Sequence, residues 1–202
     1  MHNCMSIIRK ICKAPGWFWR NKFWLLNKRH FAAFGKKSRF EKPLRVDGIE
    51  SIAIGDNVMI HEGSWLAAMP LTGNDVELVL HDGVTIGNYN HIYATKSIVI
   101  EKDVLTADKV YISDNLHEYE DINLPVIKQP IKQCKPVVIG EGSWLGEHVC
   151  VIGASVGKHC VIGANAVVTK DIPDYSVAVG APARVIKKYD SKEEKWVSNR
   201  LQ

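Results

Sequence analysis

The sequence predicts an all-β protein whose single chain winds into a narrow parallel coil of β-strands. The first observation is a six-residue repeat of aliphatic residues, which fits neither the 3.6-residue period of a helix nor the two-residue period of a half-buried strand. Fourteen of the fifteen repeat positions are aliphatic, with a threonine as the exception: Ile54, Ile60, Leu66, Leu80, Ile86, Ile92, Ile100, Thr106, Ile112, Ile139, Leu145, Val151, Val156, Ile162 and Val168. The second observation is that the residue four places later is often small or β-branched, as at Val58, Ser64, Val84, Val104, Val110, Ser143 and Ala166. Three six-residue strands per turn predict a triangular prism of about five coils, with successive coils about 4.8 Å apart.

The residues that do not fit the eighteen-residue coil fall only between groups of three strands. They are residues 72–79, 98–99 and 118–138, so all three excursions are expected to leave the prism from one corner. The longest excursion is polar and contains three prolines. Because long irregular loops on compact domains are usually functional, we expect residues 118–138 to form an active-site loop.

Three segments are predicted along the chain. With 202 residues, 46% of them hydrophobic, one main core is expected. The first 45 residues contain twelve Lys or Arg and one acid, whereas the remainder contains fourteen bases and twenty-one acids. We predict a basic, aromatic and partly helical cap segment at residues 1–49, the coil at residues 50–173, and a tail with a helix at residues 174–202.

The N-terminal segment has two interpretations, because aromatic residues stand among its bases, including Trp17, Phe18, Trp19, Phe23 and Trp24. The segment can cap the first coil, whose backbone groups would otherwise be unpaired. It can also lie on an anionic membrane through residues 7–37, with its aromatic rings in the interface. Capping is favoured, and both can hold. No nucleic-acid partner is expected, because no recognition motif accompanies the basic residues.

Cysteine and histidine usage predicts a cytoplasmic protein without a metal centre. The five cysteines form no C-x-x-C pair and are odd in number, which favours a reducing compartment. Bases interrupt the N-terminal apolar residues, so neither a signal peptide nor a spanning helix is expected, and any contact with the inner membrane face would be peripheral. The six-residue frame places His61, His81, His148 and His159 on different faces of the prism, so no metal is expected.

Three stretches carry a family resemblance: "ISDNLHEYEDINLPVIKQP", "GEGSWLG" and "VVTKDIPDYSVAVGAPARVIKK". Over about residues 50–188 the sequence resembles the hexapeptide-repeat acyltransferases. Within them it is similar to the maltose/galactoside-type acetyltransferases and their relatives acting on bacterial surface polysaccharides. The resemblance implies a left-handed parallel β-helix, a homotrimer, and acetyl-CoA as the acyl donor.

His117, at the start of the long excursion, is the candidate catalytic residue. A histidine of ordinary pKa is mostly neutral at cytoplasmic pH and can accept a proton from an attacking hydroxyl. The resemblance implies that it is the general base for direct attack of a sugar hydroxyl on the thioester. Asn115 stands where relatives often have a second histidine. Asn90 and Asp114 are candidate acceptor-binding residues: Asn90 needs either a buried backbone partner or an acceptor, and Asp114 is suited to orient the loop.

The resemblance also implies a donor site along the groove between coils, with cationic residues near the C-terminus for the phosphates of the coenzyme. The matching candidates are Trp144, Gly146, Ala164, Thr169, Lys170, Arg184 and Lys187.

Together these features predict an acetyl-CoA-dependent O-acetyltransferase that modifies a sugar hydroxyl during synthesis of a surface polysaccharide. Two alternatives stay open. One is N-acetylation of a nucleotide-linked amino sugar, and the other is a catalytically silent scaffold, against which the intact His117 argues.

Overall fold

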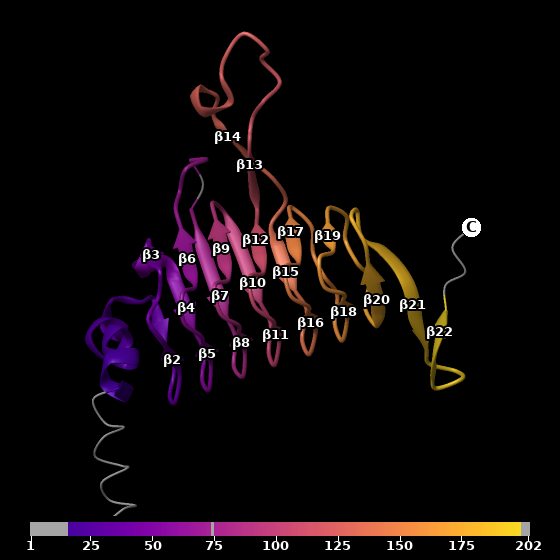
Figure 1. Ribbon diagram of the computed structural model, residues 1–202, viewed down its shortest axis with the longest axis horizontal. Coiled ribbons are helices and arrows are strands. Elements are labelled where there is room, and N and C mark those ends of the chain that lie inside the picture. Colours follow the sequence, from indigo (N-terminus) through magenta and orange to yellow (C-terminus); the bar gives the residue numbers. More distant parts are fainter. Residues whose placement is uncertain (1–15, 74, 199–202) are drawn as a thin grey trace, which may run out of the picture.

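The computed structural model describes residues 16–73 and 75–198, which form a parallel β-helix of three sheets (Figure 1). The first five coils each contribute one short strand to each sheet, and strands of successive coils pair in parallel. Sheet 1 contains β1 (Ala33–Phe34), β4 (Ile52–Ile54), β7 (Glu77–Leu80), β10 (Ser97–Ile100) and β15 (Val137–Ile139). After β15, sheet 1 continues only through isolated bridges at Val156 and Ile172. The parallel part of sheet 2 contains β2 (Arg39–Phe40), β5 (Met59–Ile60), β8 (Thr85–Ile86), β11 (Leu105–Thr106), β16 (Trp144–Leu145), β18 (Val161–Ile162) and β20 (Ser176–Val179). Sheet 3 contains β3 (Arg45–Asp47), β6 (Trp65–Ala68), β9 (His91–Ala94), β12 (Tyr111–Ser113), β17 (Cys150–Ile152) and β19 (Val167–Val168).

Helical structure is a minor part of the described chain. Residues 16–27 form an α-helix, and three short 3-10 turns are η1 (Lys28–His30), η2 (Ile49–Ser51) and η3 (Val126–Lys128). Among the described residues, no helix has the length and apolar character needed to cross a bilayer.

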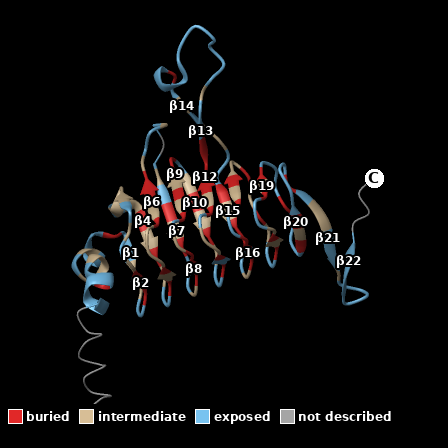
Figure 2. Ribbon diagram, viewed as in Figure 1, coloured by how far each residue is buried: buried red, intermediate tan, exposed pale blue. Residues whose placement is uncertain are grey.

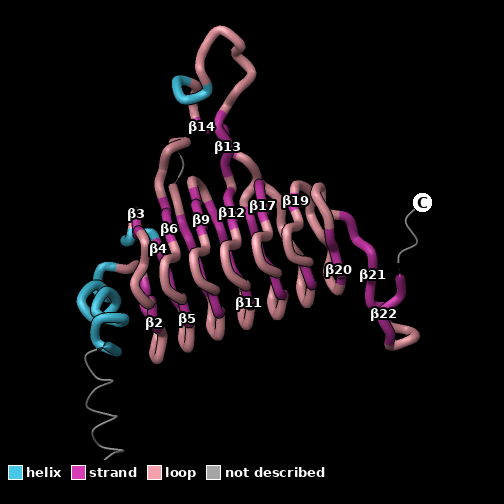
Figure 3. Tube along the Cα trace, in the orientation of Figure 1, coloured by secondary structure: helices cyan, strands magenta, loops and turns pink. Residues whose placement is uncertain are grey.

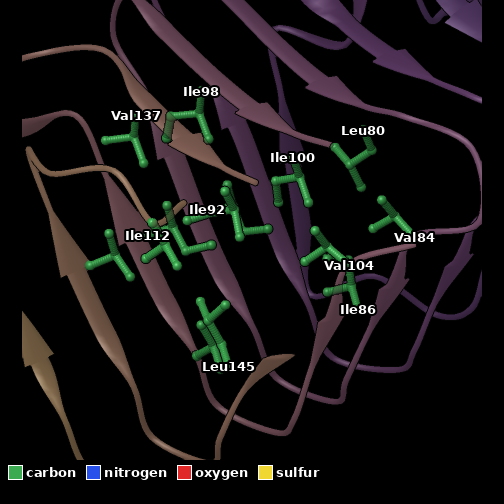
Figure 4. Packing of buried hydrophobic residues seen from close by; sticks show 14 of the residues in the cluster. Leu80, Val84, Ile86, Ile92, Ile98, Ile100, Val104, Ile112, Val137 and Leu145 are labelled. Carbon is green, nitrogen blue, oxygen red and sulfur yellow. The ribbon is translucent and has the colours of Figure 1, made fainter. Parts of the chain in front are cut away.

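The six-residue repeat forms the core of the prism. All fifteen repeat positions are buried, and Figure 4 shows Leu80, Ile86, Ile92, Ile100 and Ile112 pointing into the same interior. Burying an aliphatic side chain of this size stabilises the fold by about 1.5–3 kcal/mol. Buried and partly buried residues alternate along most strands of the coil, drawn in red and tan in Figure 2. The predicted pattern of inward positions is therefore confirmed.

The one polar repeat position has a partner inside the coil. The hydroxyl of Thr106 donates to Oδ1 of Asn90 at 2.9 Å and accepts the backbone N–H of Gly87 at 3.1 Å. Because these groups bond to one another, the interior accommodates them without an unpaired polar atom.

The first coil begins earlier than predicted. Strands β1, β2 and β3 pair with the next coil, so the β-helix starts at Ala33 and not at residue 50. Its residues at the six-residue spacing are Phe34, Phe40 and Val46. The frame was traced through aliphatic residues, and the aromatic side chains of this coil were therefore read as part of the cap.

The helix at residues 16–27 covers the end of that first coil. The ring of Phe23 meets Phe40 edge to face, with centroids 5.6 Å apart, and Trp24 stacks on Phe34 at 6.0 Å. Nδ2 of the buried Asn21 donates to the carbonyl of Trp17, and its Oδ1 accepts the indole N–H of Trp24. The described part of the N-terminal segment therefore acts as a cap; residues 7–15 lie outside the described residues.

The predicted helix in the C-terminal tail is wrong for the part of the tail that the structure describes. The parallel ladder continues past residue 173 into β20, and the chain then turns back as β21 (Arg184–Asp190) and β22 (Lys195–Ser198). Both strands pair antiparallel at the end of sheet 2. The β-branched Val185 and Ile186 favour an extended chain here, and β20 offers a free edge for pairing.

Two of the three predicted excursions leave from one corner, as predicted, whereas residues 98–99, predicted as the third, lie within β10. The connections from β6 to β7 and from β12 to β15 both leave the prism where sheet 3 ends and sheet 1 begins. The second connection forms a hairpin that stands clear of the prism (Figure 3). It is the long loop expected at residues 118–138.

Candidate active site

His117 lies at the base of the projecting hairpin. It ends β13 (Asn115–His117), which pairs antiparallel with β14 (Ile131–Gln133) and places His117 opposite Ile131. The imidazole is exposed. Because the hairpin follows β12 after a single residue, the position of His117 is fixed by the fourth coil.

Asp114 attaches this hairpin to the preceding coil. Its buried carboxylate accepts backbone N–H groups from Thr95 at 2.7 Å, Lys96 at 2.7 Å and Ser97 at 2.9 Å. The hydroxyl of Thr95 donates to the same carboxylate at 3.0 Å. Asp114 therefore positions the loop, as predicted, while its role in acceptor binding stays a prediction.

Gln133 joins the two excursions. Its Nε2 donates to the carbonyl of Asp114 at 2.8 Å, and its Oε1 accepts the hydroxyl of Thr72 at 2.6 Å. The hydroxyl oxygen of Thr95, whose proton the Asp114 carboxylate accepts, lies 3.0 Å from the same Oε1. The loop after β6 and the hairpin after β12 are thus held together beside His117.

A pocket of about 420 Å³ opens beside His117. Its lining comes from sheet 3, from the loop after β6 and from the hairpin, and consists of Trp65, Leu71, His91, Tyr93, Tyr111, Asn115, Leu116, His117 and Ile131. One rim therefore carries the candidate base, and the floor is largely aromatic.

The aromatic wall of this pocket (Trp65, His91, Tyr93 and Tyr111) is a continuous set of rings. Trp65 stacks on His91 with centroids 4.1 Å apart and an interplanar angle of 8°. Tyr93 meets both rings edge to face, at 5.7 Å and 5.8 Å, and Tyr111 lies 5.2 Å from His91. The indole N–H of Trp65 donates to Asp47 at 2.8 Å, which fixes the orientation of the first ring.

His91 has an unusual environment within the wall. Its Nε2 is buried and has no hydrogen-bond partner among the described residues. Burial lowers the pKa of His91, so the neutral imidazole is favoured. Burial is also the main cause that raises the pKa of Tyr93, and the charge of Asp47 adds to it. A buried polar atom without a partner is uncommon in proteins.

Sequence reasoning missed the aromatic wall. Its residues point outward, where the six-residue repeat sets no requirement. A signal was present, because Trp65, His91 and Tyr111 each directly precede an inward repeat position, and the structure pairs them in one row across β6, β9 and β12. Comparing outward positions between coils would have found this row.

Asn90, the second acceptor candidate, lies inside the coil. It is 1% exposed, and its Nδ2 donates to the carbonyl of Ala107 at 2.9 Å. Its Oδ1 accepts the hydroxyl of Thr106. Of the two roles considered for Asn90, the structure supports the buried structural one and leaves no amide group for an acceptor. Asn115 is also buried and donates to the carbonyl of Tyr93 at 3.2 Å.

The predicted donor residues fall into two groups. Gly146 and Ala164 are neighbours on the corner between sheets 2 and 3, where a Cβ on Gly146 would lie 2.7 Å from the backbone nitrogen of Ala164. Trp144 is 47% exposed on sheet 2, and Lys187 lies in the same row of that sheet, beyond Val161 and Val177.

Arg184, at the start of β21, belongs with the first group, since it pairs with Val179 at the end of sheet 2. Thr169 and Lys170 form the second group, exposed on the other corner of sheet 3, where the hairpin also leaves the prism. One chain therefore does not bring all seven residues together.

The remaining histidines do not form a metal centre with other ligands. Within residues 16–73 and 75–198, no group of three or more His, Cys, Asp or Glu side chains is arranged to hold a metal ion. His159 stacks on Tyr175 instead, with centroids 5.7 Å apart.

Comparison with known proteins identifies the class of protein that this fold and site define. The model of the hexapeptide repeat of succinyl-transferase matches residues 136–170. WbbJ of Escherichia coli K12, named a putative lipopolysaccharide biosynthesis O-acetyl transferase, is 36% identical over 165 residues, which cover 78% of this chain and 81% of that protein. Rv3034c of Mycobacterium tuberculosis, named a probable acetyltransferase, is 36% identical over 159 residues. These residues cover 77% of this chain and 52% of the relative, so the chain spans about half the length of that protein. The chain belongs to the hexapeptide-repeat acyltransferase family.

Solved structures share the architecture. AntD, an N-acyltransferase from Bacillus cereus solved with dTDP and 3-hydroxybutyryl-CoA, has a TM-score of 0.70 and 19% identity, covering 83% of this chain and 88% of that chain. PerB from Caulobacter crescentus, solved with CoA and GDP-perosamine, has a TM-score of 0.54 and 20% identity, covering 75% of this chain and 58% of that chain. At this identity the likeness concerns the fold alone, and the left-handed parallel β-helix is confirmed.

Proposed function

We propose that the protein transfers an acetyl group from acetyl-CoA to a hydroxyl of a sugar, with His117 as the general base. The observation that carries this proposal is the position of His117, on an anchored hairpin at the rim of a pocket with an aromatic wall. Names of relatives that include acetyltransferase and O-acetyl transferase support the same reaction class.

The chemistry needs one proton acceptor beside the acceptor hydroxyl. A ring nitrogen of His117 takes the hydroxyl proton as the oxygen attacks the thioester carbonyl, and the new C–O bond forms. When the tetrahedral intermediate collapses, the C–S bond breaks and the CoA thiolate receives the proton. An ester and free CoA result, and His117 returns to its neutral form. No acyl-enzyme intermediate is required.

The aromatic wall suits the acceptor. The C–H face of a sugar ring packs well on aromatic side chains, and Tyr111, at the end of the row of rings, presents such a surface. Asp114 contributes by holding the hairpin, since both of its carboxylate oxygens already accept backbone N–H groups.

The donor site stays with the residues predicted for it. Trp144, Gly146, Ala164, Arg184 and Lys187 are proposed to contact the pantetheine arm and the phosphates, and Thr169 and Lys170 do so from the other corner. In a homotrimer, corners of two neighbouring chains can line one groove, which would unite the two groups. The exposed apolar residues of the hairpin loop support such an assembly, because Ile122 is 93% exposed, Ile127 87% and Tyr119 68% in the single chain.

Synthesis of a surface polysaccharide is the proposed setting, since the name of WbbJ refers to lipopolysaccharide biosynthesis. N-acetylation of a nucleotide-linked amino sugar is the second candidate. It is supported by structures that share the fold and were solved with a nucleotide or a nucleotide sugar.

An acceptor screen separates the two reactions. Purified protein, acetyl-CoA and a panel of sugars and nucleotide-linked amino sugars are incubated, and released CoA is read with a thiol reagent. After acetyl-CoA is removed, an ester product is cleaved by hydroxylamine at alkaline pH, whereas an amide survives. A hydroxylamine-stable product with amino sugars alone would replace the O-transfer proposal with N-transfer.

His117→Asn tests the general base. Turnover should fall by about 10²–10⁴-fold while acetyl-CoA affinity and melting temperature stay unchanged, since the residue is exposed. The matched control is His148→Asn on another corner, where the backbone has φ of 58° and asparagine is well tolerated. If His117→Asn kept a tenth or more of wild-type kcat, His117 would not be the base.

A further inference from the structure

The N-terminal helix presents a second face that the coil does not cover. The cap uses Phe23, Trp24 and the buried Asn21. A helix turns by about 100° per residue, so Phe18, Lys22 and Leu26 project from one side, with Trp19 beside them. These apolar side chains are exposed: Phe18 by 46%, Trp19 by 57% and Leu26 by 66%. We call Phe18, Trp19, Lys22 and Leu26 the outer helix face.

The outer helix face combines large apolar groups with a cation. Nζ of Lys22 lies 4.5 Å from the centroid of the Trp19 ring. Two large aromatic rings and a leucine on one short helix are more apolar surface than capping requires. Such a surface on a soluble chain indicates a partner.

A second feature of the same end is a hollow of about 420 Å³ beside the helix. Aromatic rings of Trp17, Trp24 and Phe34 line it together with the basic residues Lys28, Lys36, Lys37 and Arg39. No acidic residue lines it, and the nearby carboxylate of Asp56 already accepts the backbone N–H of Lys36. Basic groups beside aromatic rings form a suitable site for an anionic group attached to an apolar one.

Charge decides which partner fits. Residues 16–40 contain seven Lys or Arg and no acid. A second copy of this chain would place like charges against each other, which disfavours self-association through this face. An anionic phospholipid surface complements both features, because tryptophan and phenylalanine rings favour the bilayer interface and lysine and arginine are attracted to anionic headgroups.

We propose that the N-terminal end of the β-helix is a peripheral membrane-binding site. The outer helix face lies in the headgroup region of an anionic bilayer, and the basic residues around the hollow attract the anionic headgroups. The helix thus has two functions: its inner face caps the first coil, and its outer face holds the enzyme at a lipid surface.

The test is vesicle co-sedimentation of the full-length chain. Vesicles of phosphatidylcholine alone and with 30% phosphatidylglycerol are compared at low and at high salt. Binding is expected only to the anionic vesicles and should weaken as salt rises. The variant Lys36→Glu/Lys37→Glu should weaken binding by roughly 30-fold or more, since each cation near the surface contributes about fivefold. The control variant Lys102→Glu/Lys192→Glu makes the same charge change at exposed lysines away from this end, and it should bind several-fold more tightly than Lys36→Glu/Lys37→Glu.

A second variant tests the apolar contribution. Trp19→Ser/Leu26→Ser should reduce vesicle binding at least tenfold and leave the melting temperature unchanged, because both side chains are exposed. Lack of binding to anionic vesicles at low salt would overturn the proposal, as would equal losses in the basic pair and in its control. A change of molecular mass in solution on Trp19→Ser/Leu26→Ser would show that the face binds protein instead. Acetyl transfer to a soluble acceptor is measured separately, so this result does not depend on the proposed reaction.

Discussion

Replacing Asp114 by asparagine should loosen the hairpin that carries His117. The carboxylate of Asp114 accepts three backbone N–H groups from residues 95–97, within 2.7–2.9 Å. In Asp114→Asn one carboxylate oxygen is replaced by an NH₂ group, which cannot accept a hydrogen bond. In one orientation this group would face the N–H groups of Lys96 and Ser97. In the other orientation it would face the N–H and the hydroxyl of Thr95. The structure therefore loses two hydrogen bonds to a charged acceptor, which contribute about 1.5–3 kcal/mol each. The expected local cost is about 3–6 kcal/mol.

The same change should lower the rate of acetyl transfer. A displacement of His117 by about 1 Å can cost about 10²-fold in rate, so kcat is expected to fall by that order. Hydrogen exchange of the amides of residues 95–97 reports the lost hydrogen bonds directly. The control is Asp82→Asn, whose exposed carboxylate accepts the backbone N–H of Asp56 and should cost no more than about 1 kcal/mol. Wild-type exchange at residues 95–97 together with wild-type kcat would refute the positioning role.

Three further changes test the coil, the loop and the pocket. Ile86→Asp should abolish soluble protein, because it buries an unpaired carboxylate in the core. The control Glu101→Ala should lower the free energy of unfolding by no more than about 1 kcal/mol. Equal melting temperatures of the two variants would contradict the six-residue frame. Replacing residues 120–134 by a short Gly/Ser linker should spare the coil and acetyl-CoA affinity but abolish acceptor use, and unchanged kcat/KM for the acceptor would argue against the pocket. Burial lowers the pKa of His91, so stability present above the unfolded-state pKa of about 6.5 is lost as pH falls. His91→Phe should flatten the decline in unfolding free energy between about pH 7 and 5, and an unchanged slope would show that His91 does not carry it.

The coil could be predicted because each turn of it requires an aliphatic side chain at the same inward positions. Each inward position, such as Ile86 or Ile112, faces a narrow interior that excludes most side chains, and the spacing of six follows from the three-sided cross-section. In the first coil Phe34 and Phe40 stand at the same six-residue spacing, so the repeat was visible in the sequence with aromatic residues in place of aliphatic ones. The β-branched residues of Arg184–Asp190 favour an extended chain, but its antiparallel pairing depends on the edge left by β20 and is not visible in the local sequence.

The candidate site could be predicted only in part. His117 was found through its place at the start of a long excursion, which is visible in one sequence. The roles of Gln133 and of the aromatic wall depend on which residues of different coils become neighbours. His91 and Trp65 are 26 residues apart, and the register that stacks them is set by the inward residues and not by the rings themselves.

The two ends of the β-helix determine whether molecules can stack end to end. The last strands of a stack of parallel coils have unpaired N–H and C=O groups, so they can pair with the strands of another chain. Here the aromatic helix closes one end, and β21 and β22 reverse the strand direction at the other. An antiparallel hairpin with an exposed lysine, Lys195, at its outer strand does not match the first coil of another molecule. The chain ends therefore keep coils from adding end to end into a fibre.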